Sequence, residues 1–246
     1  MINDFVVNDP FYKAGTTFTE LGRDRIDEVL RLLREQQPQS ILDVGFFPGL
    51  VGQALRNHGF HGRLDGLGLL NGQPAENFKP TYNHLFIHEL DPFHGPVGPF
   101  DLGQAYDLIL GLEIVEHLLD PFPFFRLLAS HLSERGVALV STPNVSSFGA
   151  LCRLMRGRSN YESIERWLEF GKSEWRPHVR LYDRRELIDL GQRHGLSTVA
   201  HRYYTNQALS YERRRGPTWF ARRLASALVP WFREDQFICY RRLSAP

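Results

Sequence analysis

Residues 41–49 read ILDVGFFPG, a short apolar run followed by a turn bounded by two glycines. Residues 40–45 (SILDVG) predict a buried strand, and residues 49–58 (GLVGQALRNH) predict the helix after the turn. Gly45 and Gly49 allow the backbone to turn sharply and to approach a ligand closely. The free N–H groups of the following helix N-terminus favour a carboxylate or a similar anion. Alternatively, such a turn only packs a helix on a strand and binds no ligand. The rest of the chain decides between these two interpretations.

The segments on either side of this turn alternate between helical and strand patterns. Residues 106–112 (YDLILGL) form a continuous apolar run of the kind that a central parallel strand shows. Helices are predicted over residues 18–35, 121–131 and 183–194, and further strands over 62–69, 82–90, 136–142, 196–204 and 236–243. The sequence therefore predicts an α/β fold, with a doubly wound, mostly parallel seven-stranded sheet. We expect an antiparallel C-terminal strand pair and helices on both faces.

The domain organisation follows from where this alternation breaks. A length of 246 residues suits one large α/β domain with an elaboration. We predict an N-terminal arm over residues 1–17 and a single domain over residues 18–246. Residues 144–180 interrupt the pattern and predict a helical insertion above the carboxyl ends of the strands. Residues 211–232 predict a basic helical segment.

Composition excludes several classes of protein. The net charge of +1 gives no argument for a nucleic-acid partner. Cys152 and Cys239 lie far apart without a CxxC pattern, which favours a reducing compartment over a disulfide framework. The N-terminus lacks a signal-peptide pattern, and no apolar run approaches the roughly 18 residues of a membrane span. We therefore expect a cytoplasmic protein without stable membrane insertion. The charge is uneven, however, since residues 201–246 hold nine arginines against three acidic residues, a local balance of +6.

Several segments resemble the class I (Rossmann-like) S-adenosylmethionine-dependent methyltransferases. ILDVG (residues 41–45) followed by Gly49 is similar to their first motif. YDLILGLEIVEHLLDP (residues 106–121) is similar to the fourth-strand motif of the small-molecule branch that includes ubiquinone-type O-methyltransferases. GVALVSTPN (residues 136–144) resembles the fifth strand of that branch, and PHVRLY (residues 177–182) its late segment. The resemblance runs in order from about Phe18 to Tyr204, and it implies S-adenosylmethionine as the cofactor and a small molecule as the substrate.

Two positions depart from the family pattern. Phe47 stands where the glycine turn of the family has a further glycine. Gly68 stands where the second strand of the family ends in an acidic residue that binds the ribose hydroxyls. Loss of such a charge-assisted hydrogen-bond pair costs roughly 1.5–3 kcal/mol. Binding would then be weaker by about a hundredfold unless another group substitutes.

The resemblance also implies a set of cofactor-site residues. Asp43 would hold the glycine turn near the methionine end, although its side chain can instead cap that turn. Glu89 would approach the adenine amine, or it is an ordinary solvated carboxylate after the third strand. Phe46 and Phe47 either pack on the adenosine or fill the place where it would lie. The expected cofactor-binding residues are Asp43, Gly45, Phe46, Phe47, Gly49, Gly68, Glu89, Leu90 and Glu113.

Two histidines are candidates for the catalytic base. His117 begins the helical turn after Glu113, which the resemblance places at the sulfonium side of the cofactor. With a pKa near roughly 6.5, a histidine here can take a proton from a substrate hydroxyl. The alternative is a helix-start histidine bonded to the backbone. His178 is the rival base, in the segment that would fold over the substrate. The ten histidines show no ligand spacing that demands a metal, so we expect none.

Residues 219–232 (WFARRLASALVPWF) predict a basic amphipathic helix. Its apolar stripe would contain Phe220, Leu224, Leu228 and Trp231. We favour a helix that covers the sheet or forms a homodimer face. The alternative is contact with a membrane surface or a lipid substrate.

Two functional hypotheses remain from different classes of protein. The first is methyl transfer from S-adenosylmethionine to a small-molecule or carbohydrate-like acceptor, at oxygen, by in-line displacement in which alignment of the reactants provides most of the catalysis. The second is a catalytically inactive methyltransferase-like protein that serves in binding or assembly, as Phe47 and Gly68 would suggest.

Overall fold

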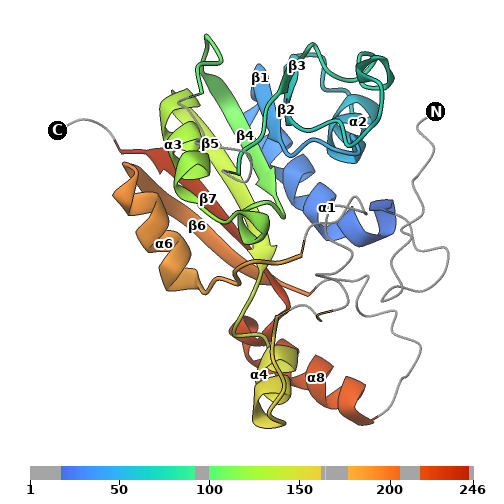
Figure 1. Cartoon of the computed structure of the whole chain (residues 1–246), viewed down its shortest axis with the longest axis vertical. Helices are drawn as coiled ribbons and strands as arrows, with labels where there is room; N and C mark the ends of the chain where they lie inside the picture. The colour runs from blue at the N-terminus through green and yellow to red at the C-terminus, as the bar shows by residue number, and fades with distance from the viewer. Residues whose placement is uncertain (1–17, 92–99, 162–163, 165–176, 206–216, 244–246) are drawn as a thin grey trace.

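A computed structural model of the chain describes residues 18–91, 100–161, 164, 177–205 and 217–243 (Figure 1). The predicted N-terminal arm, residues 1–17, lies outside the described residues, as does most of the second half of the predicted insertion. Within the described residues, no helix combines the length and the apolar character that a membrane crossing requires.

Seven strands form one sheet in the order β3-β2-β1-β4-β5-β7-β6. The first five are parallel, whereas β7 runs antiparallel to both β5 and β6. The strand order reverses between the neighbours β1 and β4, which makes their carboxyl ends the topological switch point. The predicted fold class is confirmed. The strands are β1 (Ser40–Val44), β2 (Arg63–Gly68), β3 (His84–Ile87), β4 (Tyr106–Leu112), β5 (Leu132–Pro143), β6 (Leu196–Tyr204) and β7 (Asp235–Arg242).

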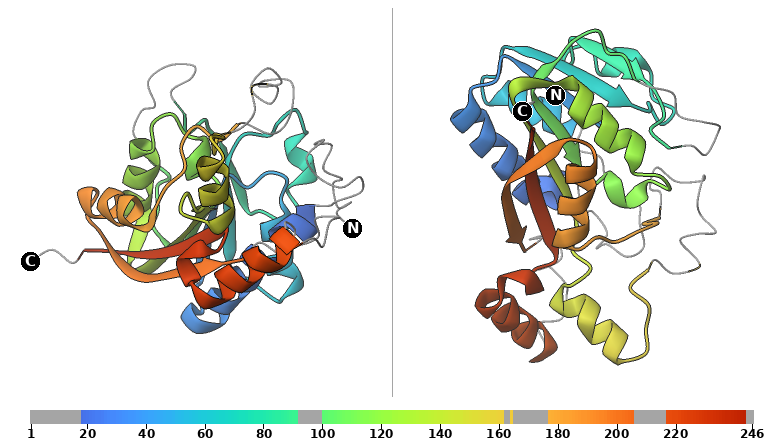
Figure 2. Two further views of the ribbon diagram at one scale, coloured as in Figure 1. Left: turned by 90° about the horizontal axis from the view of Figure 1, so that it is seen from below. Right: turned by 90° about the vertical axis from the view of Figure 1, so that its left-hand side faces the viewer.

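Helices cover both faces of the sheet, as expected (Figure 2). Apolar side chains of α1 (Phe18–Gln36) and α2 (Leu50–Asn57) share one core cluster with Leu108 and Leu110 of β4. Side chains of α3 (Phe122–His131) and α6 (Arg184–Arg193) share a second cluster with Ile109, which points to the other face. This alternation along β4 explains its continuous apolar run, because both of its faces are buried. Asp183 and Glu186 form a capping box that starts α6.

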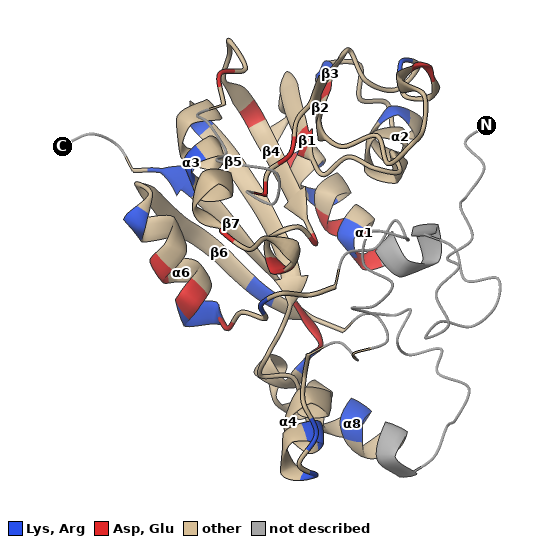
Figure 3. Ribbon diagram, viewed as in Figure 1, with Lys and Arg blue, Asp and Glu red and all other residues tan. Residues whose placement is uncertain are grey.

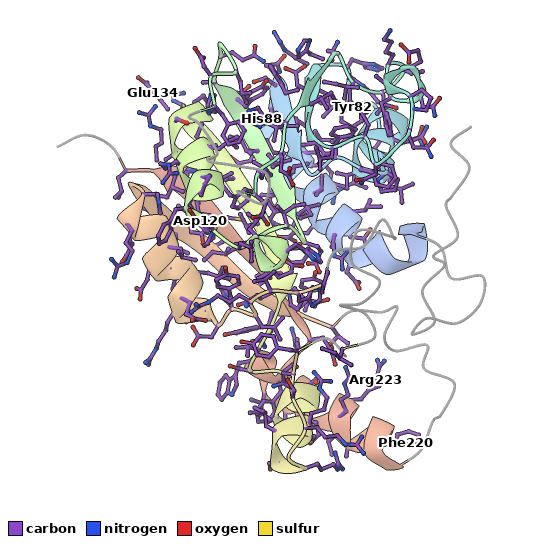
Figure 4. The ribbon with its side chains drawn as sticks, viewed as in Figure 1. Tyr82, His88, Asp120, Glu134, Phe220 and Arg223 are labelled. Carbon is purple, nitrogen blue, oxygen red and sulfur yellow. The ribbon has the colours of Figure 1, made fainter. Side chains whose placement is uncertain are left out.

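The third strand is shorter than the pattern predicts. Residues 82–90 were expected as one strand, but β3 covers only His84–Ile87. Tyr82 precedes the strand and is buried against the side of α2, where Figure 4 labels it. A hydrogen bond from its hydroxyl to Asp43 fixes this position. Glu89 and Leu90 follow the strand, and Leu90 belongs to the core.

Two further helices form a lobe beyond the carboxyl end of β5. α4 (Phe148–Met155) follows β5, and α8 (Pro217–Leu228) leads through the short helix η4 (Pro230–Phe232) into β7. We call residues 144–161 together with residues 217–233 the α4–α8 lobe. It extends away from the sheet at the bottom of Figure 1. The stripe of residues 219–232 does not cover the sheet, because Phe220, Leu224, Leu228 and Trp231 are exposed. The other half of the favoured prediction, a homodimer face, stays a prediction.

Candidate active site

The candidate site lies at the carboxyl ends of β1, β2 and β4. The first turn is held between its two neighbours: Gly45 N donates to Leu67 O at 2.7 Å, and Ile114 of the loop after β4 covers the other side. A Cβ on Gly45 would lie 2.0 Å from Ile114 Cδ1, so a larger residue would displace that loop. The turn, the end of β2 and the loop after β4 therefore form one packed unit.

The glycine turn has the geometry that the sequence predicts. Gly45 and Gly49 have φ values of +74° and +93°, in the left-handed region that favours glycine. Gly49 precedes α2, whose first turn holds neither a side-chain cap nor an acidic residue. The N–H groups at this helix start can therefore receive a carboxylate such as that of a methionyl group.

The two phenylalanines of the turn face different surroundings. Phe46 is 2% exposed, and its ring centroid lies 5.2 Å from that of Phe78 and 5.4 Å from that of Tyr82. The ring also covers Gly66 of β2, where an added Cβ would be only 3.0 Å from it. Phe46 is thus part of the core on the α1–α2 face. Phe47 is half-buried, with its ring centroid 6.3 Å from that of Phe78.

Asp43 is buried beneath this turn. Its Oδ2 accepts a hydrogen bond of 2.6 Å from the hydroxyl of Tyr82. Burial raises the pKa of Asp43 to about 7, although the hydrogen bond from Tyr82 lowers it in part. Tyr82 lies before β3, in a segment that the sequence pattern assigned to the strand. The pairing of Tyr82 with Asp43 was therefore not predicted. Asp43 therefore joins β1 to the segment before β3.

The end of β2 and the segment after β3 lie at the side where the ribose and adenine are expected. Gly68 has φ +150°, and its carbonyl accepts a hydrogen bond from His88 N at 3.1 Å. Glu89 is partly buried and has an interaction partner. Leu90 is 7% exposed and packs in the core cluster that α3 and α6 share. Gly68 therefore carries no carboxylate at the position where the family pattern places one.

Two side chains hold that of Glu113, which lies directly after β4. It has a φ of +54°, which is strained for a residue with a side chain. Its Oε1 accepts a hydrogen bond of 2.8 Å from Ser141 Oγ, and its Oε2 lies 3.1 Å from Arg25 of α1. Burial lowers the pKa of Arg25, but Glu113, Tyr204 and Asp235 raise it to a net value above the ordinary one. Arg25 therefore stays charged and pairs with the Glu113 side chain.

Glu116, His117 and His178 form the most concentrated group of titratable side chains at this edge. The ring centroids of His117 and His178 are 4.8 Å apart, and Glu116 Oε1 lies 3.8 Å from His117 Nε2. The possible ligand atoms of the three residues all lie within 4.8 Å of one another. The structure thus brings together the two histidines that the sequence analysis treated as rivals. We call these three residues the acid–histidine cluster.

Backbone hydrogen bonds hold the cluster together. The N–H groups of Val179 and Arg180 donate to the carbonyl of Glu116 at 2.7 and 3.2 Å. His117 Nδ1 lies 3.4 Å from the carbonyl oxygen of Pro177. This nitrogen therefore bonds to the backbone, as the alternative to a catalytic base predicted. If Nδ1 carries the proton, the lone pair is on Nε2, which faces Glu116. The ring is then oriented to accept a proton or to bind a metal ion.

Glu116 itself is fully buried and only partly satisfied. Its Oε2 accepts a hydrogen bond of 2.9 Å from Thr142 Oγ1. Its Oε1 has no hydrogen-bond partner among the described residues. Burial, and then the nearby charge of Glu113, raise the pKa of Glu116 well above its usual range. A carboxylate oxygen beside two imidazoles is a donor set that divalent metals such as zinc accept. The sequence showed no such set, because His178 is far from His117 along the chain.

Solved structures identify the fold. A S-adenosylmethionine-dependent methyltransferase from Clostridium acetobutylicum superposes with a TM-score of 0.58 at 11% identity, over 93% of each chain. The CcbJ methyltransferase from Streptomyces caelestis superposes with a TM-score of 0.58 at 17% identity, over 91% of this chain and 90% of its own. At these identities the similarity concerns the fold alone. The fold is therefore that of the class I (Rossmann-like) S-adenosylmethionine-dependent methyltransferases.

Sequence comparison identifies the family. Residues 18–201 match the family described as "Methyltransferase domain", and the chain belongs to this family. The "Ubiquinone biosynthesis O-methyltransferase" of Ruegeria pomeroyi is 25% identical over 206 residues, which cover 81% of this chain and 73% of that protein. The protein of the same name from Azorhizobium caulinodans is 36% identical over 151 residues, 59% of this chain and 54% of its own length. The chain thus spans about half to three quarters of these relatives.

Proposed function

We propose that this protein transfers a methyl group from S-adenosylmethionine to a hydroxyl oxygen of a small-molecule acceptor. The observation that supports this most strongly is the acid–histidine cluster at the switch point, next to Glu113. A hydroxyl must lose its proton as it is methylated, and the cluster supplies groups that accept one. The names of the curated relatives also favour an oxygen acceptor on a small molecule. A carbohydrate hydroxyl satisfies the same chemistry.

The residues present fit the methionine end of the cofactor better than the sugar end. The uncapped start of α2, with Gly45 and Gly49 before it, suits the methionyl carboxylate. Glu113, which pairs with Arg25, is a carboxyl group suited to the sulfonium side. Gly68 offers no carboxylate to the ribose, so we expect modest affinity. When bound, S-adenosylmethionine supplies a methyl group already activated by its sulfonium leaving group.

The acid–histidine cluster can activate the acceptor in two ways. In the first, Nε2 of His117 accepts the hydroxyl proton while Nδ1 stays directed at the carbonyl of Pro177. In the second, Glu116, His117 and His178 would hold a divalent cation, which would supply a Lewis acid that lowers the pKa of the acceptor hydroxyl. The buried Oε1 of Glu116, which lacks a hydrogen-bond partner among the described residues, favours the second way.

The proposal is tested by an assay that follows transfer of a labelled methyl group to a panel of phenolic, catecholic and carbohydrate hydroxyls. We expect transfer to oxygen for at least one class of acceptor. Chelation with EDTA should abolish transfer and added divalent cation should restore it if a metal acts, whereas EDTA has no effect if His117 is the base alone.

The competing hypothesis is a binding or assembly protein without catalytic activity. The absence of an acid at Gly68 and the presence of Phe47 favour it. It predicts no product with any acceptor, with or without added metal, from protein that still folds. That result would reject the proposed methyl transfer.

A further inference from the structure

The α4–α8 lobe exposes large apolar side chains on two adjacent helices. On α4, Leu154 is 54% and Met155 is 78% exposed. On α8, Leu224 is 62% and Leu228 is 73% exposed, and Trp231 of η4 is 55% exposed. An amphipathic helix normally buries its apolar stripe. An exposed stripe therefore indicates a surface that binds a protein, a membrane or a ligand.

The same lobe carries positive charge. Residues 144–161 and 217–233 contain six arginines and neither aspartate nor glutamate. Figure 3 shows blue segments on α4 and α8 and no red on either helix. Arg222 is paired with Glu234, the residue directly before β7, whereas Arg156 and Arg158 are exposed. The lobe therefore combines an apolar surface with a basic one.

We propose that the α4–α8 lobe docks on the surface of a membrane that contains anionic phospholipid. Exposed leucine, methionine and tryptophan side chains insert at the boundary between headgroups and acyl chains, and arginines bind the phosphate groups. A second copy of this chain is a poorer occupant. A two-fold symmetric contact through this lobe would bring the basic surface of one copy, which includes the exposed Arg156 and Arg158, against the same surface of the other.

The lobe is joined directly to the candidate active site. Asn144, the residue after β5, donates from its side-chain amide to the carbonyls of Trp231 and Arg233 at 2.9 and 2.8 Å. Just before Asn144 along the chain, Ser141 and Thr142 bind Glu113 and Glu116. A docked lobe would therefore hold the acid–histidine cluster close to the membrane surface. Docking itself does not depend on the proposed methyl transfer and can be measured without it.

The test is co-sedimentation of the full chain with vesicles of phosphatidylcholine, with and without phosphatidylglycerol. We expect binding to the anionic vesicles at least about tenfold tighter than to the neutral ones, and weaker binding as the salt concentration rises. The double variants Leu154→Glu/Met155→Glu and Leu224→Glu/Leu228→Glu should each weaken binding by about tenfold or more. The matched control is Ile87→Glu/Val199→Glu, which changes two exposed residues on β3 and β6 and should bind as the unchanged chain does.

Three results would overturn the proposal. One is no binding to either kind of vesicle, and another is equal weakening by the control variant. The third is a dimer in light scattering that dissociates in the lobe variants, which would make the lobe an interface between copies. Circular dichroism checks that each variant is folded. If a double variant unfolds, Met155→Glu and Leu228→Glu replace it singly, because these are the most exposed large apolar residues on their helices.

Discussion

The two sides of the candidate site differ in how they are built. The cofactor side, formed by the turn after β1 and the end of β2, is packed with aromatic rings and has Gly68 where a carboxylate is expected. The acceptor side, formed by the loop after β4 and residues 177–180, holds Glu113, Glu116 and two histidines. Buried charges destabilise a fold unless they are paired, so a dense group of them indicates a functional demand. The titratable groups of the proposed site are therefore concentrated on its acceptor side.

Removal of either histidine is expected to have the largest effect. His178→Ala and His117→Ala should each lower the rate of methyl transfer by about 10²–10⁴-fold, because each removes a proton acceptor or a metal ligand. Binding of S-adenosylmethionine should change little, since both histidines lie on the acceptor side. The control is His58→Ala, an exposed histidine at the end of α2. If the histidine variants lost cofactor affinity as much as rate, the histidines would also serve the cofactor side, contrary to this prediction.

The pH dependence of stability should report on the cofactor side. The pKa of Asp43 is raised from an ordinary 3.8 to about 7, so its protonated form stabilises the fold. The contribution of protonated Asp43 to the free energy of unfolding is complete below about pH 4 and is lost as the pH rises to 7. It amounts to at most about 4 kcal/mol. Urea unfolding of the unchanged chain and of Asp43→Asn should show a smaller loss over this range in the variant. Parallel curves would contradict the buried position of Asp43.

Loss of the arginine that pairs with Glu113 should destabilise the acceptor side. Arg25→Gln leaves a partly buried carboxylate without its cation, so we expect the free energy of unfolding to fall by about 3 kcal/mol. Arg31→Gln is the matched control on the same helix, because both partners of Arg31 lie one turn away on that helix and the Glu35 side chain is 49% exposed. That variant should lose less than about 1 kcal/mol. Equal losses in urea unfolding would argue against a special role for the Arg25–Glu113 pair.

The smallest effect concerns the tightness of the glycine turn. Gly45→Ala and Gly59→Ala both place a Cβ at a positive φ, but only the first meets a neighbour, Ile114. We expect Gly45→Ala to cost about 1 kcal/mol more stability than Gly59→Ala. It should also weaken cofactor binding, because the turn and the loop after β4 are packed together. Identical thermal unfolding and cofactor affinity in the two variants would contradict that packing.

The sequence predicted the sheet and its helices because those depend on local patterns. The apolar run of residues 106–112 indicated a central strand, and Gly45 and Gly49 occupy the conformations that the turn requires. Tertiary contacts were not accessible in the same way. The pairing of Arg25 with Glu113 joins the first helix to the end of the fourth strand, and no local sequence pattern predicts it.

The acid–histidine cluster and the exposed stripe show the same limit. His117 and His178 were both predicted as site residues, but as alternatives, because nothing in the spacing shows that they meet. Glu116 was noted only as part of a motif, since its burial is a property of the folded chain. The stripe of α8 was predicted to cover the sheet or to form a homodimer face, because amphipathic periodicity does not reveal whether the apolar side of a helix meets the sheet, a partner or solvent.

The central claim is that the turn after β1 still accepts S-adenosylmethionine in spite of Phe47 and Gly68. Isothermal titration calorimetry with S-adenosylmethionine and with its demethylated product, S-adenosylhomocysteine, measures this directly. The account predicts saturable one-to-one binding of both compounds, weaker in Gly45→Ala and unchanged in His178→Ala. An absence of heat at millimolar concentrations of both compounds, from folded protein, would contradict it.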